Sequence, residues 1–175
     1  LKFTSGTSHD AELHPEFSRI PINFGNQPSI QTSNIFNLLD RPDLTQYWTR
    51  NVVKETFSGL SPATGYNGDE DQGLMGSLNV LLKIGVFQMN GGTDENPQYQ
   101  IGSPLFTKVS IQLNPNYYQG KIFVIEAKNN SSENIYINGI KYNSTPVEKF
   151  SISHESITNG GKLILEMSNK QSHNF

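Results

Sequence analysis

The sequence predicts an α+β protein whose helices come before its strands. In the first half of the 175-residue chain apolar residues recur at helical spacing, and after Gly91-Gly92 they alternate as in strands. The second half also contains Asn138-Gly139 and Asn159-Gly160, dipeptides that favour tight turns. Helices and strands grouped in separate stretches are typical of α+β domains. We therefore expect a helical segment over residues 1–90 and a small antiparallel, sandwich-like β unit over residues 91–175.

Two helices are expected after a loop-like stretch that is rich in Ser, Thr, His, Pro and Gly. The first begins at Ser29 and presents a partly apolar face. The second begins near Asp43, a good N-cap residue with Gln46 three positions on, and runs through Thr56. Its apolar residues, which include Trp48, recur at spacings of three and four and are expected to face a core.

A third helix follows a turn-rich loop. Met75, Leu78 and Leu82 form its expected inner face, and Gly85 is its expected C-cap. Helices with one apolar face each do not close a core by themselves, because most helical stability comes from tertiary packing. The helical segment is therefore expected to be a piece of a larger helical assembly.

Six short strands are expected in the second half. Each is rich in β-branched or aromatic residues and bounded by Asn, Gly, Pro or Ser. The predicted strands are Tyr99–Ile101, Lys108–Leu113, Lys121–Ala127, Ile135–Tyr142, Lys149–Ser153 and Lys162–Met167. Four aromatic residues of this half, Tyr117, Tyr118, Phe123 and Tyr136, could stack on sugar rings, but their spacing favours packing in the core or at a sheet edge.

Composition excludes several classes of protein. The formal net charge is −3, from 13 basic and 16 acidic residues without a run of either sign, so no basic stripe for nucleic acid exists. There are no cysteines, which excludes disulfides and thiolate metal sites. No apolar stretch approaches the roughly 18 to 20 residues that span a membrane. The four histidines lie at no spacing that suggests a metal site.

The densest polar cluster is the run YNGDEDQG (66–73), at a loop-to-helix junction. The three adjacent carboxylates of Asp69, Glu70 and Asp71 repel one another unless positive charge offsets them, and a helix N-terminus supplies such charge. One interpretation is a helix cap with acidic first-turn residues. The other is a ligand site, in which Asp69 and Asp71 share a water molecule or a cation. Composition does not choose between them.

A second polar cluster, FGNQPS (24–29), precedes the first expected helix. It is either a turn followed by a cap or a site where Asn26 and Gln27 hold a sugar hydroxyl or a hard cation. Amide oxygens are among the ligands that Ca²⁺ accepts.

Six segments in register make the chain resemble the C-terminal end of glycoside hydrolase family 92, a family of exo-acting α-mannosidases. The similarity extends from about Arg19 to the end and covers only the last part of the family's much longer chain. The segments are GNQPS (25–29), GYNGDEDQG (65–73), IGVF (84–87), IGSPLFTKVSIQL (101–113), KIFVIEAKNNSSENIYINGIKYN (121–143) and SHES (153–156) with NGGKLILEM (159–167).

The resemblance implies roles for the polar clusters. In the family the second Asp of the Asp-x-Asp pair is the general base that activates water, which corresponds to Asp71, with Asp69 as its supporting partner. Asn26, Gln27 and Glu70 are then expected to contact the substrate. The family inverts configuration at the anomeric carbon and uses Ca²⁺ to bind and distort the terminal mannose, and Asn26 is a candidate calcium ligand.

The same resemblance implies that the chain is incomplete as an enzyme. The family's general acid, a Glu, lies upstream of the aligned region and is expected outside this chain. The helical segment would supply the last hairpins of an (α/α)6 barrel, and the missing N-terminal part of the same polypeptide would be its partner. A periplasmic or extracellular, bacterial setting is the expectation from the family. The isolated chain is expected to be inactive.

Several positions depart from the family pattern. Leu74 stands where the family commonly has Gln, beside the expected base, and this exchange puts activity in doubt. Gln27 replaces the acidic residue of the family's Gly-Asn-Glu-Pro-Ser, and Ile30-Gln31 replace a His pair. The segment GSLNVLLKIG (76–85) also differs from the family's usual helix.

The resemblance therefore implies part of a calcium-dependent, inverting exo-α-mannosidase that removes terminal α-linked mannose from glycans such as N-glycans or yeast mannan. One alternative is a non-catalytic β module that binds carbohydrate or braces the barrel. Another is a glycoside phosphorylase, but the acidic loop holds none of the basic residues that a phosphate site requires.

Overall fold

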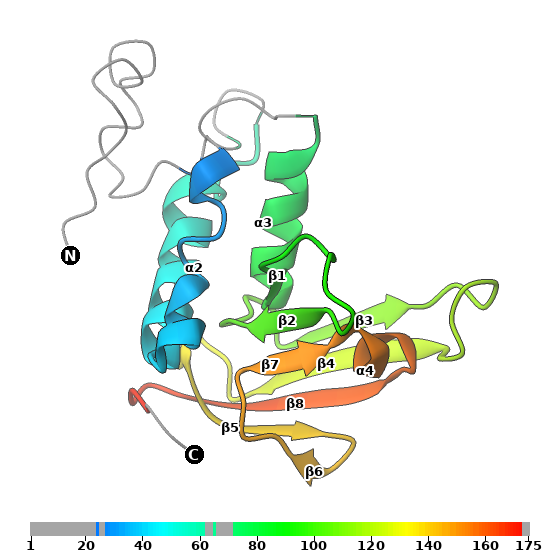
Figure 1. Cartoon of the computed structure of the whole chain (residues 1–175). Helices are drawn as coiled ribbons and strands as arrows, with labels where there is room; N and C mark the ends of the chain where they lie inside the picture. The colour runs from blue at the N-terminus through cyan, green and yellow to red at the C-terminus, as the bar shows by residue number, and fades with distance from the viewer. Residues whose placement is uncertain (1–23, 25–26, 62–64, 66–71, 173–175) are drawn as a thin grey trace.

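A computed structural model describes residues 24, 27–61, 65 and 72–172 (Figure 1). Its helical elements are the 3₁₀ turns η2 (Gln27–Ser29) and η3 (Ile35–Leu39) and the helices α2 (Pro42–Thr56), α3 (Leu74–Ile84) and α4 (His154–Thr158). Its strands are β1 (Val86–Gln88), β2 (Gln98–Ile101), β3 (Lys108–Gln112), β4 (Ile122–Lys128), β5 (Tyr136–Tyr142), β6 (Thr145–Pro146), β7 (Ser151–Ser153) and β8 (Gly161–Ser168). The predicted α+β class, with helices before strands, is confirmed.

The first predicted helix is wrong: two short 3₁₀ turns, η2 and η3, occupy its place. Asp40 ends η3 in the left-handed conformation, at φ 55°. The Asn37 side chain donates to the carbonyl oxygens of Ile101 (3.0 Å) and Phe150 (3.1 Å). These hydrogen bonds to distant backbone hold the segment against the small sheet, in place of the continuous hydrogen-bond ladder of a regular helix.

Helix α2 is confirmed, but its predicted cap is wrong. The helix begins at Pro42, a residue suited to the first helical position, and Arg41 before it makes no side-chain cap. Asp43 lies buried in the first turn, where its carboxylate accepts two N–H bonds of 2.9 Å from Arg41. Gln46 closes no capping box, because its Oε1 accepts the Ile137 backbone N–H at 3.0 Å. Gln46 thus bonds to strand β5 and not to the N-terminus of its own helix, where the local sequence pattern places it.

Helix α3 is confirmed together with its end. Met75, Leu78 and Leu82 are buried, and Gly85 follows as the C-cap at φ 86°. A Cβ atom at Gly85 would lie 2.9 Å from Cβ of Pro104, so both the backbone conformation and the space there require glycine.

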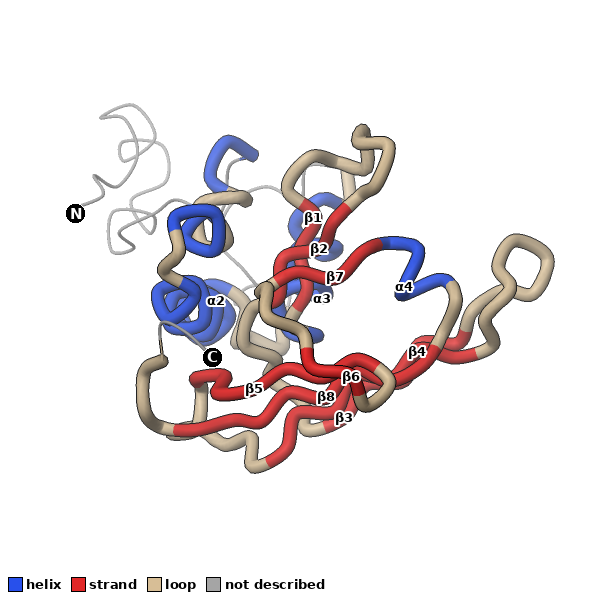
Figure 2. Tube along the Cα trace, turned by 60° about the horizontal axis from the view of Figure 1, so that its bottom comes forward, coloured by secondary structure: helices blue, strands red, loops and turns tan. Residues whose placement is uncertain are grey.

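All six predicted strands are present in the second half. Two further strands were not predicted: β1, which spans three residues directly after α3 and lies before residue 91, and β6, which spans two. The strands form a three-stranded sheet, β1-β2-β7, and a five-stranded sheet, β3-β4-β8-β5-β6. Figure 2 shows the small sheet stacked on the large one.

Antiparallel pairing, as predicted, joins every described strand pair except β4 and β8, which run parallel. The short helix α4 causes this exception. It carries the chain back to the start of β4, where Gly120 N–H donates to the Thr158 carbonyl at 3.0 Å. Asn159-Gly160 forms the predicted turn after α4, with Gly160 at φ 78°.

The other predicted turn, Asn138-Gly139, is wrong. It lies within β5, where the pairing with β8 shifts between Ile137 and Gly139 as a β-bulge. β5 pairs with β8 both before and after this point, so the dipeptide bends the strand and does not reverse the chain.

Two apolar clusters form the core. One lies between the two sheets and the other between helices α2, α3 and strand β1. Successive residues of β1 serve different clusters: Val86 belongs to the first and Phe87 to the second. The small sheet is therefore a layer between helix α3 and the large sheet (Figure 1), whereas α2 also contacts strand β5 of the large sheet directly. The predicted domain boundary at residue 90 stays a prediction, although β1 already precedes it.

Candidate functional site

Four of the five predicted site residues, Asn26, Asp69, Glu70 and Asp71, lie outside the described residues. Gln27 is described and lies exposed in η2. Their assignment to catalysis, substrate and metal therefore stays a prediction, and the described residues that flank them carry the structural evidence.

The flanks of the two polar clusters meet in the helical core. Phe24, which precedes Asn26 and Gln27 in the chain, is fully buried in the same cluster as Met75, which follows the acidic loop. Ile30 and Leu74 pack against this cluster as well. Two segments more than 40 residues apart in sequence are therefore anchored to one cluster, as a shared site would require.

A side-chain hydrogen bond adds a second anchor for the first segment. Gln31 Nε2 donates to the Met89 carbonyl at 2.8 Å, which ties the chain after η2 to the end of strand β1. Gln31 stands at one of the positions where the sequence departs from the family's His pair. The exchanged residue thus has a structural role here.

The start of α3 decides against one interpretation of the acidic run. The N-cap is Gly73, at φ 91°, and the first turn of the helix contains no acidic residue. Asp69, Glu70 and Asp71 precede this N-cap in the chain, so they do not form the first turn. The prediction of a helix cap with acidic first-turn residues is wrong, and the alternative, a ligand site, stays a prediction.

Leu74 is the first residue of α3 and is half-buried against the helical cluster. Its alkyl side chain contributes to packing at the base of the acidic loop. At this position an apolar side chain that packs against the core therefore stands where the family commonly has the polar amide of Gln.

No described helix is long and apolar enough to cross a membrane. Among the described residues no group of three or more His, Cys, Asp or Glu side chains is arranged to hold a metal ion. Of the four aromatics considered for sugar stacking, Phe123 and Tyr136 are buried, as their spacing favours, whereas Tyr117 and Tyr118 are exposed.

A groove of about 740 Å³, which the sequence did not predict, lies beside α2. It is lined by Arg50, Lys54 and Lys83 together with apolar, hydroxyl and amide side chains, and no carboxylate is among its lining residues. A paired acid and base are thus absent from its described walls. In the sequence, this wall of the groove could have been detected from the spacings of three and four that place Tyr47, Arg50 and Lys54 on one face of α2.

Comparison with known proteins identifies the family. Residues 3–169 match the glycosyl hydrolase family 92 catalytic domain. A relative from Arthroderma benhamiae, described as an uncharacterized secreted glycosidase, is 30% identical over 150 residues, which are 85% of this chain and 18% of the relative.

Solved structures agree with this match. The family 92 α-mannosidase BT3965 from Bacteroides thetaiotaomicron superposes with a TM-score of 0.75 at 27% identity, over 85% of this chain and 19% of that protein. The same enzyme has been solved with mannoimidazole. The family 92 inverting mannosidase BT2199 from the same organism gives a TM-score of 0.74 at 29% identity, over 95% of this chain and 23% of that protein.

The chain thus spans less than a quarter of the length of these relatives. The match nevertheless covers the helices, both sheets and the two polar clusters. The chain belongs to glycoside hydrolase family 92.

Proposed function

We propose that this chain is the C-terminal part of an exo-α-mannosidase that hydrolyses terminal α-linked mannose with inversion. The observation that carries the proposal is the family match over residues 3–169, which includes the acidic run before α3. Two structurally similar relatives are mannosidases, and one was solved in complex with mannoimidazole. The packing of Phe24 and Met75 in one cluster supports a shared site for the two polar segments.

In this proposal Asp71 is the general base and Asp69 orients the attacking water. An inverting glycosidase needs an acid and a base roughly 6.5–9.5 Å apart, with water on the far face of the sugar ring. The acid would come from the part of the catalytic domain that this chain does not cover. Glu70 and Gln27 would hydrogen-bond the hydroxyls of the mannose.

We include Ca²⁺ in the proposal because of the oxygen atoms that the two polar clusters offer as ligands. Asn26 offers an amide oxygen, and the acidic run offers carboxylate oxygens, which are the ligand types that Ca²⁺ prefers. Bound there, the ion would supply a positive charge that grips sugar hydroxyls. The same positive charge would favour the ionised form of Asp71, which is the form a base requires.

The secreted relative from Arthroderma benhamiae supports a compartment outside the cytoplasm. We extend the proposal to a periplasmic or extracellular enzyme that acts on mannose-containing oligosaccharides.

The test uses the longer enzyme that contains this chain, with calcium, and follows α-1,2-mannobiose by proton NMR. We expect β-mannose as the first product and a loss of about 10²–10⁴-fold in kcat for Asp71→Asn. Asp40→Asn is the matched control, because Asp40 is exposed and its left-handed backbone suits Asn.

α-Mannose as the first product would contradict inversion. Full activity of Asp71→Asn would contradict the role of Asp71. If the unmutated enzyme releases no mannose from any α-linked disaccharide, the non-catalytic module becomes the better description, and Leu74→Gln is the first variant to examine.

A further inference from the structure

The groove beside α2 combines elements from both halves of the molecule. Helix α2 forms one wall, and the other walls come from the end of α3, the connection before β3 and the β4–β5 connection. Its volume of about 740 Å³ lies within the range of sites that bind ligands or partner side chains. The residues used below are Tyr47, Arg50, Lys54, Leu60, Lys83 and Leu105.

The groove concentrates positive charge in a chain whose net charge is −3. Three of its lining residues, Arg50, Lys54 and Lys83, are cationic, and none is acidic. Lys83 Nζ donates to a carbonyl oxygen, that of Phe57, at 3.1 Å. Among the described residues, Lys54 Nζ forms an ion pair with its neighbour Glu55, whose carboxylate lies 3.8 Å away, and both side chains are exposed. An acidic group that enters the groove would therefore meet little competition.

Arg50 is held in place with part of its donor capacity unused. Its Nε donates to Ser103 Oγ at 2.9 Å, and an Nη2 N–H donates to Asn130 Oδ1, so both acceptors are neutral. Asn130 is itself fixed, because its Nδ2 donates to the carbonyl oxygens of Pro104 and Leu105. A guanidinium has five N–H donors, so three remain for a partner. Burial lowers the pKa of Arg50, which reflects a charge removed from water without a carboxylate.

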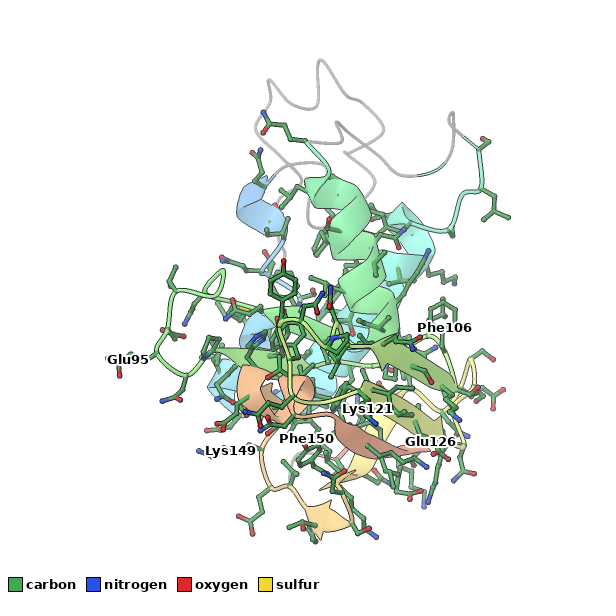
Figure 3. All side chains as sticks on the ribbon, turned by 90° about the vertical axis from the view of Figure 1, so that its right-hand side faces the viewer. Glu95, Phe106, Lys121, Glu126, Lys149 and Phe150 are labelled. Atoms are coloured by element: carbon green, nitrogen blue, oxygen red, sulfur yellow. The ribbon has the colours of Figure 1, made fainter. Side chains whose placement is uncertain are left out.

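The rim of the groove is apolar and exposed. Leu60 is fully accessible, and Tyr47 and Leu105 each expose about two fifths of their surface. The neighbouring Phe106 projects outward beside the lower end of α3 (Figure 3). A cluster of exposed apolar side chains around an anchored arginine is the composition of a protein interface, in which Tyr and Arg commonly contribute most of the binding energy.

We propose that this groove docks an apolar segment bearing a carboxylate, supplied by the part of the family 92 catalytic domain that this chain does not cover. The chain spans 18–23% of the length of these relatives, so other segments make up most of such an enzyme and are available to pack against the groove. The rim buries the apolar side chains of the segment, and the fork of Arg50 receives its carboxylate, with Lys54 and Lys83 on either side. The inference rests on the proposed function only in that the chain works within a longer catalytic domain.

The test exploits the absence of cysteine from this chain. In the longer enzyme, Leu60→Cys and, separately, Tyr117→Cys are alkylated under native conditions, and the rates are read by peptide mass spectrometry. Tyr117 is the matched control, because it is also highly exposed and lies outside the groove. We expect alkylation at position 60 to be at least about tenfold slower than at position 117, because docking raises the free energy of exposing the thiol.

A charge reversal tests the carboxylate. Adding Lys54→Glu to the Leu60→Cys enzyme is expected to speed alkylation at position 60 severalfold, because two carboxylates then repel. Lys149→Glu, an exposed change outside the groove, is the matched control. No change with Lys54→Glu would overturn the assignment of a carboxylate.

Equal alkylation rates at positions 60 and 117 would overturn the docking proposal. Protection that disappears on dilution would overturn it too, because the occupant would then be a second copy. Mannose release by the unmutated enzyme is recorded in parallel. Release without protection would reject the docking alone, and protection without release would reject the proposed activity alone.

Discussion

The helical part and the β unit of this molecule are stabilised in different ways. Twelve buried residues form the cluster between the two sheets, and every strand except β6 contributes to it or packs next to it. The cluster of the helical part has eight buried residues, one of which is Phe87 of β1. Helix α3 also leaves Val80 more than half exposed on its outer face. The β unit thus closes its own core, whereas the helical part, in the residues that the structure describes, packs on one side only.

Polar side chains join the two parts, beside the apolar Leu81 and Ile84 of α3, which pack against the cluster of the β unit. Asn37, Gln46 and Arg50 each reach from the helical part to backbone or side-chain atoms of the β unit. All of these bonds span more than 50 residues in sequence. Such bonds are directional, so they set the position of α2 over the sheets, while each apolar cluster supplies most of the stability of its own part.

The largest expected effect tests the apolar cluster of the β unit. Phe123 is fully buried on β4, so Phe123→Ala removes a large side chain and leaves a cavity. We expect the free energy of unfolding to fall by about 3–5 kcal/mol in urea titrations. Ile122→Ala is the matched control, because Ile122 lies next on the same strand but is about half exposed; its loss should be about 1 kcal/mol or less. Similar losses for both variants would contradict a self-contained core.

A smaller effect on stability is expected at the contact between helix α2 and strand β5. Gln46→Ala removes the acceptor of the buried Ile137 N–H, so the unfolding free energy should fall by about 1–3 kcal/mol. Hydrogen exchange at the Ile137 amide should also become faster, which a loss of helix packing alone would not produce. Glu55→Ala, an exposed change on the same helix, should leave both measurements nearly unchanged. Unaltered exchange at Ile137 would show that this bond does not fix α2 on the sheet.

The smallest effect is expected on the surface of the large sheet. The Lys162 ammonium hydrogen-bonds Glu126 and lowers the pKa of that carboxyl below its ordinary value of 4.5, and the charges of Lys128 and Lys108 add to the shift. The native state therefore binds this proton less readily than the unfolded chain. The resulting stability is present above the ordinary pKa and is lost as the pH falls through the lowered native pKa.

Glu126→Gln should accordingly lower the urea midpoint slightly at pH 7, and the difference from the unmutated protein should vanish in acid. Figure 3 shows Glu126 on the open face of the sheet, so 1 M salt should also reduce the difference. A difference that persists in acid and in high salt would point to packing instead of charge.

Local sequence predicted the elements whose structure depends on neighbours a few residues away. Helix α3 with its Gly85 cap and the six strands follow from apolar periodicity and from glycine's conformational freedom. The family followed from six segments in register. For the candidate site, the sequence predicted which residues belong to it but not that its two segments lie together. Its described flanks, Phe24 and Met75, pack in one cluster although they are far apart in the sequence, and no local pattern predicts such a contact.

Tertiary structure decided the rest. It replaced the first predicted helix by 3₁₀ turns, gave Gln46 a partner 91 residues away, set β8 parallel to β4 and assembled the groove around Arg50. In each case a long-range hydrogen bond or contact outweighs a local preference that is worth about 1 kcal/mol or less per residue. Composition and periodicity therefore determined most of the elements, and contacts between distant segments determined the remaining ones, where all of them lie and which side chains they bring together.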